Sequence, residues 1–441
     1  MRGDSKHAVM RFVIPVTLEN IVLVLTGIII STFLGHISPS ALAATSSANL
    51  IINLYIALFS VLITGSAVLI ARLIGAREVR EASRTVEQSI LLTSVLSIFF
   101  MLVSVLFANH LIRAAIPRAD TQLYTESVRY FRIISLSIPF AMLRYVLMSV
   151  LRASGNSRGP LITAFAVNGS QILFAALFIK LFKLKMLGAA LAYVSCQTVG
   201  FAMTLLLVFH SHGSFHVNIR NLARPHGPTI RRILRIGLPT SLEQTCVQIG
   251  YIVANALVVG LGTSQATIYN IANSINSFPG IPHAIAAAVS TTFVGQSLGA
   301  GKPQEAKRFG LRVLTFCAPI VLVLYVLFAL LSPALAPLYT DDADVMRGVV
   351  KASWVLVGIS LPSIGVNTLD PSLRVGGDAK FVMIQTILGV WIVRLPLTYL
   401  LGYALGMGIT GVYLANIISL SFRSVLGFIR YRGGKWLYRR V

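Results

Sequence analysis

The chain has 441 residues, of which 56% are hydrophobic and only 12% are charged, and its mean hydropathy is +0.80. A soluble globular protein carries about 25% charged residues, so the composition excludes that class and indicates a protein embedded in a lipid bilayer. The formal net charge of +23 would by itself suggest a nucleic-acid partner, and where the basic residues lie is therefore important.

Twelve apolar runs follow one another along the chain, and each is long enough to cross a bilayer as a helix, which takes about 20 residues. The six runs of the first half cover residues 12–34, 41–71, 86–110, 131–151, 160–181 and 186–209. The six of the second half cover residues 236–260, 265–298, 309–332, 349–370, 381–402 and 408–429. The sequence therefore predicts an all-α integral membrane protein with twelve transmembrane helices.

The second half of the chain repeats the first. Residues 14–20 (IPVTLEN) and 238–244 (LPTSLEQ) each follow an arginine and open an apolar run, and their glutamates lie 243 − 19 = 224 positions apart. The same offset pairs Ala48-Asn49 with Ala272-Asn273 and Gly75-Ala76 with Gly299-Ala300, and residues 151–156 match residues 373–378 at an offset of 222. Chance matches do not keep one register over such a distance, so the chain is an internal duplication.

This duplication predicts three parts: an N-lobe over residues 1–209 with spans 1–6, a cytoplasmic linker over residues 210–235, and a C-lobe over residues 236–441 with spans 7–12. Each half has an even number of spans, so both enter the membrane from the same side. The two six-helix repeats are therefore expected to be parallel and related by an axis along the membrane normal.

The basic residues are concentrated in loops at one end of the predicted spans. They lie in the N-terminal segment, after the second span, in the central linker, after the eighth span and in the C-terminal tail, whereas the acidic cluster Asp341, Asp342 and Asp344 lies at the other end. This is the positive-inside pattern, and it places both termini on the cytoplasmic side of a cytoplasmic (inner) membrane. Topology and contact with anionic lipid headgroups explain the charge, and no nucleic-acid partner is expected.

Four motifs resemble those of the multidrug and toxic compound extrusion (MATE) family of the MOP flippase superfamily. They are residues 151–156 (LRASGN) after the fourth span, 298–308 (LGAGKPQEAKR) after the eighth, 373–378 (LRVGGD) after the tenth and 391–396 (WIVRLP) in the eleventh. The resemblance implies two six-helix lobes arranged in a V that alternate between outward- and inward-facing states. It also implies a monomeric secondary antiporter, with no enzymatic activity, that exports small organic compounds against protons or sodium.

Three acidic residues are candidates for proton coupling: Glu19 and Glu243, which lie well inside apolar runs, and Asp370, near the end of the tenth span. A carboxylate within hydrocarbon must be neutral, paired or hydrated, and a raised pKa would let it take up and release a proton. The structural alternative is that each glutamate binds a neighbouring helix or pairs with an arginine near the cytoplasmic side, and a duplicated fold keeps such residues twice.

Between the two glutamates, we hypothesise that Glu243 contributes more to coupling and Glu19 more to structure. Glu243 is followed in its span by polar partners, Gln244, Gln248 and Tyr251, whereas the next polar side chain after Glu19 and Asn20 is Thr26.

The chain departs from its family at the positions where many members carry acidic residues. Ile30 stands where the family has an aspartate in the first span, Ile172 where it has one in the fifth, and Val247 where NorM-type members have a glutamate. The usual first-lobe cation site therefore lacks its carboxylates. This favours H⁺ over Na⁺ as the coupling ion, because a hard cation needs several oxygen ligands. No cofactor and no metal site are expected, since the three cysteines show no metal-binding spacing.

Polar residues inside the apolar runs are candidates for lining a substrate cleft: Asn20, Asn49, Asn168, Gln244, Gln248, Tyr251, Asn273, His283 and Arg394. For Asn49, Asn168 and Asn273 the alternative is a hydrogen bond between helices, and for His283 it is packing or hydrogen bonding against a neighbouring helix. The Pro279-Gly280 pair before His283 has no counterpart at Tyr55-Ile56, which predicts a bend in the eighth span alone. The intramembrane Arg144 and Arg394 favour an anionic or neutral substrate over an organic cation.

These observations predict a proton-coupled exporter of small organic compounds in the bilayer. The alternative is a lipid or lipid-linked precursor flippase of the same superfamily, with a headgroup as its cargo. A membrane-embedded enzyme would need clustered nucleophiles, metal ligands or paired acids, and the sequence shows no such cluster.

Overall fold

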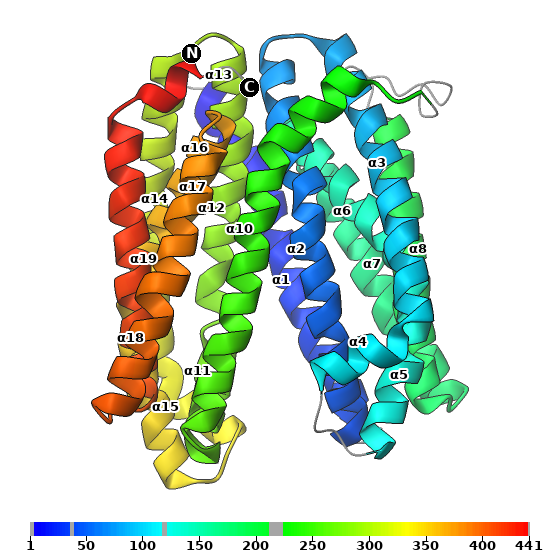
Figure 1. The fold of residues 1–441 in the computed structure, drawn as a ribbon, viewed down its shortest axis with the longest axis vertical. Helices are drawn as coiled ribbons and strands as arrows, with labels where there is room; N and C mark the ends of the chain where they lie inside the picture. Colours follow the sequence, from blue (N-terminus) through cyan, green and yellow to red (C-terminus); the bar gives the residue numbers. More distant parts are fainter. Residues whose placement is uncertain (1–3, 36–38, 117–120, 211–223, 440–441) are drawn as a thin grey trace. The chain divides into compact units, whose positions relative to one another are not determined.

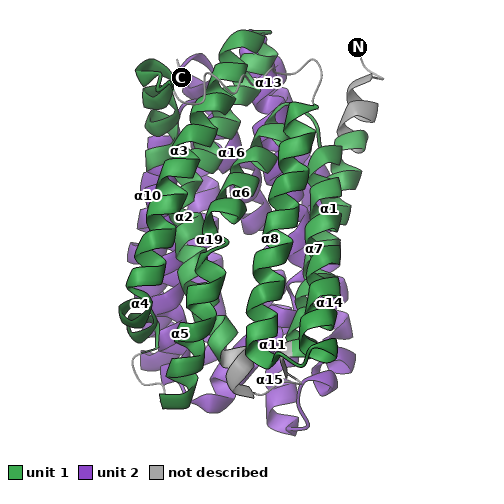
Figure 2. Cartoon of the chain, turned by 90° about the vertical axis from the view of Figure 1, so that its right-hand side faces the viewer, with its two compact units in different colours: residues 1–238 green, residues 239–441 purple. Residues whose placement is uncertain are grey.

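The structure, a computed structural model, describes residues 4–35, 39–116, 121–210 and 224–439. Every regular element in these ranges is helical, which confirms the predicted fold class (Figure 1). The chain divides into two compact units, Met1–Leu238 and Pro239–Val441, shown in green and purple in Figure 2.

Six membrane-spanning segments can be followed through the described part of the first unit. Two of them are composite: α5 and α6 are bent by 55° at residues 136–137 and count together as one span, and α7 continues into the π-helix η1. The helices are α1 (Asp4–Gly35), α2 (Pro39–Gly75), α3 (Val79–Leu106), α4 (Ala108–Ala115), α5 (Thr121–Ser135), α6 (Ile138–Ala153), α7 (Arg158–Ala175), η1 (Ala176–Leu181) and α8 (Lys185–Phe209).

The second unit has the same plan but more interruptions. Its long helices are α10 (Gly227–Gly260), α14 (Pro303–Leu335), α15 (Ala343–Val357), α16 (Ser360–Val375) and α19 (Ile409–Arg432), and α15 and α16 form a pair bent by 48°. Shorter pieces make up the remaining spans: α11 (Thr263–Ile275), η2 (Phe278–Gly280), α12 (Ile281–Val289), η3 (Ser290–Val294), α13 (Gly295–Gly299), α17 (Ala379–Ile387), η5 (Leu388–Arg394), α18 (Leu395–Tyr399) and η6 (Leu400–Ala404). The single turns η4 (Ala336–Leu338) and η7 (Lys435–Tyr438) follow α14 and α19.

Nine helices among the described residues are long and apolar enough to cross a membrane, and the two bent pairs bring the count to eleven. The twelfth predicted span corresponds to Thr263–Gly299, which is divided by the 3₁₀ turn η2. The count of twelve is therefore consistent with the structure. The predicted break in one half only is also confirmed: Pro279 lies in η2, whereas α2 continues through Tyr55 without interruption.

The predicted linker over residues 210–235 is too long at its C-terminal end. Residues 227–235 form the first turns of α10, because Pro228 is well suited to the start of a helix, where no backbone N–H is needed. Residues 211–223 of the linker lie outside the described part of the chain.

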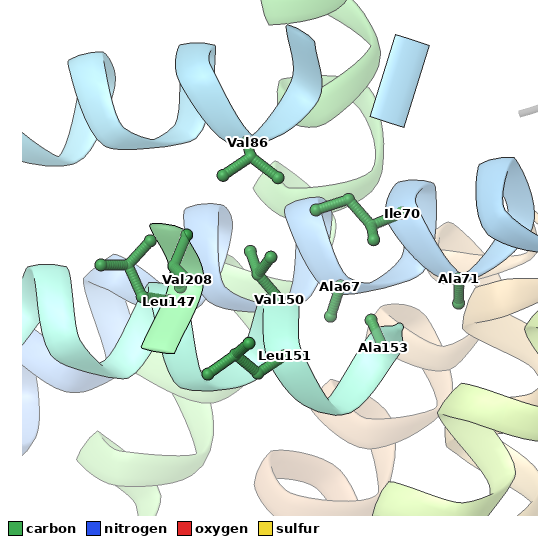
Figure 3. Close-up of a cluster of buried hydrophobic side chains, with 9 residues drawn as sticks. All are labelled: Ala67, Ile70, Ala71, Val86, Leu147, Val150, Leu151, Ala153 and Val208. Carbon is green, nitrogen blue, oxygen red and sulfur yellow. The ribbon is translucent and has the colours of Figure 1, made fainter. Parts of the chain in front are cut away.

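Small side chains let the helices of the first unit approach closely. Figure 3 shows one such cluster, in which alanines alternate with larger aliphatic residues on α2, α3, α6 and α8: Ala67, Ile70, Ala71, Val86, Leu147, Val150, Leu151, Ala153 and Val208. Gly237 lies in the part of α10 that belongs to the first unit, and an added Cβ there would lie only 1.8 Å from the carbonyl oxygen of Val61 on α2. Only glycine fits there, as is usual where membrane helices meet backbone to backbone.

The C-terminal end of the second unit is packed around Trp436. Its ring lies 4.7 Å from that of Tyr431, and its Nε1 donates a hydrogen bond of 2.9 Å to the Tyr431 carbonyl oxygen. This buried cluster covers the end of α16 close to the functional residues described next.

Candidate functional site

The three acidic residues predicted to lie within the membrane are all buried. Glu19 is on α1, Glu243 on α10 and Asp370 on α16, and Glu243 and Asp370 are only 1% and 2% exposed. Ionised carboxylates cannot be buried in this way without compensation. In each case an arginine of the same unit supplies it.

The ion pairs of Glu19 and Glu243 are repeats of each other. Arg152 Nη2 donates to Glu19 Oε1, and Arg374 Nη2 donates to Glu243 Oε1 at 2.6 Å. The two arginines hold the same place in the repeated Leu-Arg motif, 374 − 152 = 222 positions apart. Both glutamates therefore make the arginine contact of the structural alternative, and both units connect their first helix to the end of the fourth span in this way.

The second unit extends its ion pair into a larger network. Thr386 Oγ1 donates to Glu243 Oε1 at 3.1 Å, and Gln385 Nε2 donates to Asp370 Oδ1 at 2.5 Å. Gln385 and Thr386 are consecutive on α17, and Asp370 lies one turn before Arg374, the partner of Glu243, on α16, so the two carboxylates belong to one polar cluster. We call the group the Glu243–Asp370 network; its members are Glu243, Asp370, Arg374, Gln385, Thr386 and Arg423.

Two arginines balance the two acids of this network. Arg423 on α19 donates from Nη2 to Asp370 Oδ2 at 3.2 Å, and Arg374 follows Asp370 by four residues on α16, hence on the same helix face. With both carboxylates ionised, the network is electrically neutral. Adding a proton to either carboxylate therefore gives the buried site a net charge, which is costly unless the site also changes its contacts.

Beyond the ion pair, the repeat positions of the first unit do not carry the residues of this network. At the offset of 222, the counterparts of Asp370, Gln385 and Thr386 are Met148, Thr163 and Ala164, none of which is charged. The repeat thus preserves one ion pair twice and adds a second carboxylate only in the second unit.

Several buried polar atoms of the network lack a hydrogen-bond partner among the described residues. They include Glu243 Oε2, Gln385 Oε1 and the Nε atoms of Arg374 and Arg423. An unsatisfied carboxylate oxygen costs free energy while it is charged, and protonation converts it into a neutral group that can donate a hydrogen bond. Glu243 Oε2 is therefore a chemically suitable place for a proton.

The predicted cleft residues fall into three groups by exposure. Asn49, Asn273 and Tyr251 are exposed, Asn20, Gln244, Gln248 and His283 are partly buried, and Asn168 and Arg394 are buried. The amide nitrogens of Asn20 and Asn168 donate to the carbonyl oxygens of Val16 and Ala164 in their own helices, at 2.8 and 2.7 Å. The bond of Asn168 lies within its own helix and is not the interhelical contact expected as the alternative.

His283 makes the contact expected of a packed histidine. Its Nε2 lies 2.7 Å from Ser363 Oγ, which links α12 to α16, and its ring lies 6.2 Å from that of Tyr325. The alternative proposed for this residue, a hydrogen bond to a neighbouring helix, is what the structure shows.

Asn49 and Asn273 are equivalent residues of the repeat, and both are exposed on helices that cross the membrane, α2 and α11. A carboxamide facing lipid would lose its hydrogen bonds to water. An exposed amide at the same place in both halves therefore favours contact with water or a polar ligand.

The sequence-based candidates omitted Gln385, Thr386 and Arg423, and Arg152 and Arg374 were noted only as parts of a motif. Gln385 and Arg423 could have been noticed as polar residues within the apolar runs 381–402 and 408–429. Their association with Asp370 depends on the packing of α16, α17 and α19, which no local pattern reveals. No group of three or more His, Cys, Asp or Glu side chains that could hold a metal ion is found in the described ranges.

Comparison with known proteins gives consistent matches over both halves. A sequence model of the MatE family matches residues 15–177 and 239–400. The chain is 23% identical to the uncharacterized transporter YisQ of Bacillus subtilis, covering 99% of this chain and 96% of that one. It is also 23% identical to the probable multidrug resistance protein NorM of Thermotoga maritima, covering 99% and 94%, and to the multidrug export protein MepA of Staphylococcus aureus, covering 94% and 90%.

Solved structures show the same fold. A MOP superfamily transporter from Pyrococcus furiosus, described as having a binding pocket of reverse polarity, superposes with a TM-score of 0.92 at 22% identity, covering 100% of this chain and 98% of that one. A MATE family transporter in an outward-facing conformation gives a TM-score of 0.90 at 21% identity, with coverage of 97% and 95%.

Proposed function

Since the chain belongs to the MatE family of membrane transporters, we propose that it is a proton-coupled secondary exporter of small organic compounds that works by alternating access. The family is one of efflux transporters and not of enzymes, and the chain has the membrane-spanning helices that this role requires.

The observation that carries proton coupling is the Glu243–Asp370 network. It holds two buried carboxylates against two arginines in the second unit, with one carboxylate oxygen left without a donor. Uptake of a proton there would weaken the hold of Arg374 on Glu243, which connects α10 to α16. Protonation could in this way bias the two states of a transport cycle.

The proposed coupling ion is H⁺ and not Na⁺. The carboxylate oxygens of Glu243 and Asp370 already accept hydrogen bonds from arginine, glutamine and threonine side chains. A sodium ion would have to displace these donors and collect several oxygens around itself. A proton needs only one free oxygen.

The proposal is tested by transport into sealed inverted membrane vesicles with a panel of dyes and metabolites, with and without an acid-inside pH gradient. We expect uptake of at least one compound to require the gradient and to stop when a protonophore is added. Equal uptake with and without the gradient would overturn proton coupling. Flipping of a labelled lipid, with no soluble compound moved, would favour the flippase alternative.

We further propose that both termini and the 299–308 turn lie in the cytoplasm, with the chain acting as a monomer in the cytoplasmic membrane. Lys302 and Asp341 are exposed; the first lies just before α14 and the second just after the turn η4 that follows it. Single cysteines at these two positions are expected to react with an impermeant thiol reagent from opposite sides of the membrane. The background protein would lack Cys196, Cys246 and Cys317. Labelling of both positions from the same side would contradict the twelve-span topology.

A further inference from the structure

Arg394 is a buried cation that the Glu243–Asp370 network does not use. It is the last residue of the π-helix η5, within the span Ala379–Ala404, and it is only 4% exposed. π-Helical turns inside membrane helices are frequent at functional positions, because the wider turn displaces side chains and backbone carbonyls from the regular ladder.

The buried acids of the second unit are all engaged by other arginines. Glu243 pairs with Arg374 and Asp370 with Arg423, and both oxygens of Asp378 accept from Arg430 and Arg439. Within the described ranges, Arg394 makes no hydrogen bond and no ion pair. The unit therefore holds one buried positive charge more than its own carboxylates neutralise.

The ring of Tyr251 on α10 is the neighbour that Arg394 does have. The guanidinium carbon lies 4.5 Å from the ring centroid, a cation–π contact. Such a contact offsets only part of the cost of burying a guanidinium, which does not lose its proton in proteins. A charge kept under these conditions is typical of a site whose counter-ion arrives with a ligand.

The orientation of the guanidinium suits an anion. Its Nε is fully buried and has no hydrogen-bond partner. The two terminal nitrogens also have no partner among the described residues, but they are not fully buried and so remain accessible to a ligand. Two parallel N–H groups match the two oxygens of a carboxylate or phosphate. Tyr251, which is 48% exposed, offers an aromatic face beside the charge for the apolar part of a ligand.

The first unit independently shows the same excess of buried positive charge. Arg144 on α6 is buried, and its recorded partners are neutral: Gln197 Oε1 at 3.2 Å from Nε, Met148 Sδ at 3.3 Å from Nη1, and the ring of Tyr145. Both units thus keep an arginine within the membrane without a carboxylate that the described residues supply.

We propose that Arg394 and Tyr251 form an anion-binding site and that the exported compounds are amphipathic organic anions, with a carboxylate or phosphate group bound by Arg394. The direction of movement rests on the proposed function above. Binding of the anion at Arg394 does not depend on proton coupling.

The test compares two xanthene dyes of similar shape and opposite charge, carboxyfluorescein and rhodamine 6G. Fluorescence anisotropy would measure their binding to the purified full chain in nanodiscs of zwitterionic phosphatidylcholine. We expect the wild-type protein to bind carboxyfluorescein at least about tenfold more tightly than rhodamine 6G, and Arg394→Gln to weaken carboxyfluorescein binding by about tenfold or more. Arg394→Lys, which keeps the charge but loses the two-pronged geometry, should bind with intermediate affinity.

Arg347→Gln is the matched control. The side chain of this arginine is 80% exposed and pairs with Asp344, three residues earlier in α15, so its replacement should leave both affinities unchanged. Equal carboxyfluorescein binding by the wild-type and Arg394→Gln proteins, or a wild-type preference for rhodamine 6G, would overturn the proposal.

Thermal unfolding separates a binding role from a structural one. Arg394→Gln removes an uncompensated buried charge, so without dye it should be at least as stable as the wild type, and carboxyfluorescein should raise the Tm of the wild type only. A lower Tm for Arg394→Gln without dye, together with an equal loss of carboxyfluorescein and rhodamine 6G binding, would instead show that the arginine holds the fold together and would overturn the proposal.

Two further arms identify the source of the anion and separate this inference from the proposed function. If phosphatidylglycerol in the nanodisc competes with carboxyfluorescein in the wild type, and labelled phosphatidylglycerol is flipped in vesicles, the site binds a lipid headgroup; without competition, it binds a soluble anion. Loss of dye binding in Arg394→Gln without any pH-dependent transport would support the site and overturn proton coupling. If the pH gradient drove transport of rhodamine 6G and no dye binding depended on Arg394, proton coupling would be supported and the anion-binding site overturned.

Discussion

Replacing Glu243 with glutamine is expected to reduce pH-driven export to the level of protein-free vesicles while the protein still folds. Glutamine keeps an oxygen that can accept from Arg374 and Thr386, but it can no longer gain or lose a proton. Arg374 also retains a carboxylate nearby, because Asp370 lies one turn away on α16. Asp370→Asn, which removes the second titratable group of the network, should reduce pH-driven export in the same way.

The duplication supplies the matched control for this experiment. Glu19→Gln changes the equivalent residue of the first unit, where Met148 stands at the repeat position of the second carboxylate, Asp370. This variant should have a lower yield or Tm and still export in response to the pH gradient. Both proteins would be reconstituted at equal folded amounts, checked by size-exclusion chromatography. Full pH-driven transport by the Glu243→Gln protein would refute the assignment.

The largest effect on stability is expected at Arg374. Arg374→Gln leaves the buried Glu243 without a charged partner, and the loss of one member of a buried ion pair typically costs about 3–5 kcal/mol. Arg152→Gln should cost less, because the Arg152 side chain is 31% exposed and that of Arg374 only 13%, so the first pair is better hydrated. Thermal unfolding in detergent, measured for both variants under the same conditions, would give the comparison.

A double variant identifies the origin of that loss. Arg374→Gln combined with Glu243→Gln replaces both charges by neutral groups that can still hydrogen bond, and it should regain much of the stability lost in Arg374→Gln. If the loss of unfolding free energy in the double variant instead equalled the sum of the losses in the two single variants, Arg374 would stabilise the protein through contacts other than Glu243.

The fold could be predicted from the sequence because its main determinants are local. Apolar runs of sufficient length give the spans. The two Ile/Leu-Pro-x-x-Leu-Glu motifs reveal the duplication. Pro279 and Gly280 even predicted the break that divides Thr263–Gly299. The start of α10 at Gly227 was missed because a polar, arginine-rich sequence can continue a membrane helix beyond the apolar run.

The candidate site could be predicted from the sequence only in part. Burial of Glu19, Glu243 and Asp370 follows from their place in apolar runs, since few acids occur there at all. Their partners do not follow: Arg374 lies 131 positions from Glu243, and Arg423 lies 53 from Asp370. Whether an arginine such as Arg394 is paired can be judged only once every carboxylate near it has been placed by the tertiary structure.

Proton antiport itself is tested most directly by following protons while a compound leaves sealed proteoliposomes without any imposed pH gradient. The vesicles would be loaded with a compound whose uptake in the transport panel depends on the pH gradient, together with a lumenal pH indicator, and then diluted. The account predicts that the lumen acidifies as the compound leaves, and that acidification is absent with the Glu243→Gln protein. If the compound left vesicles that contain the wild-type protein with no change in lumenal pH, proton antiport would be contradicted.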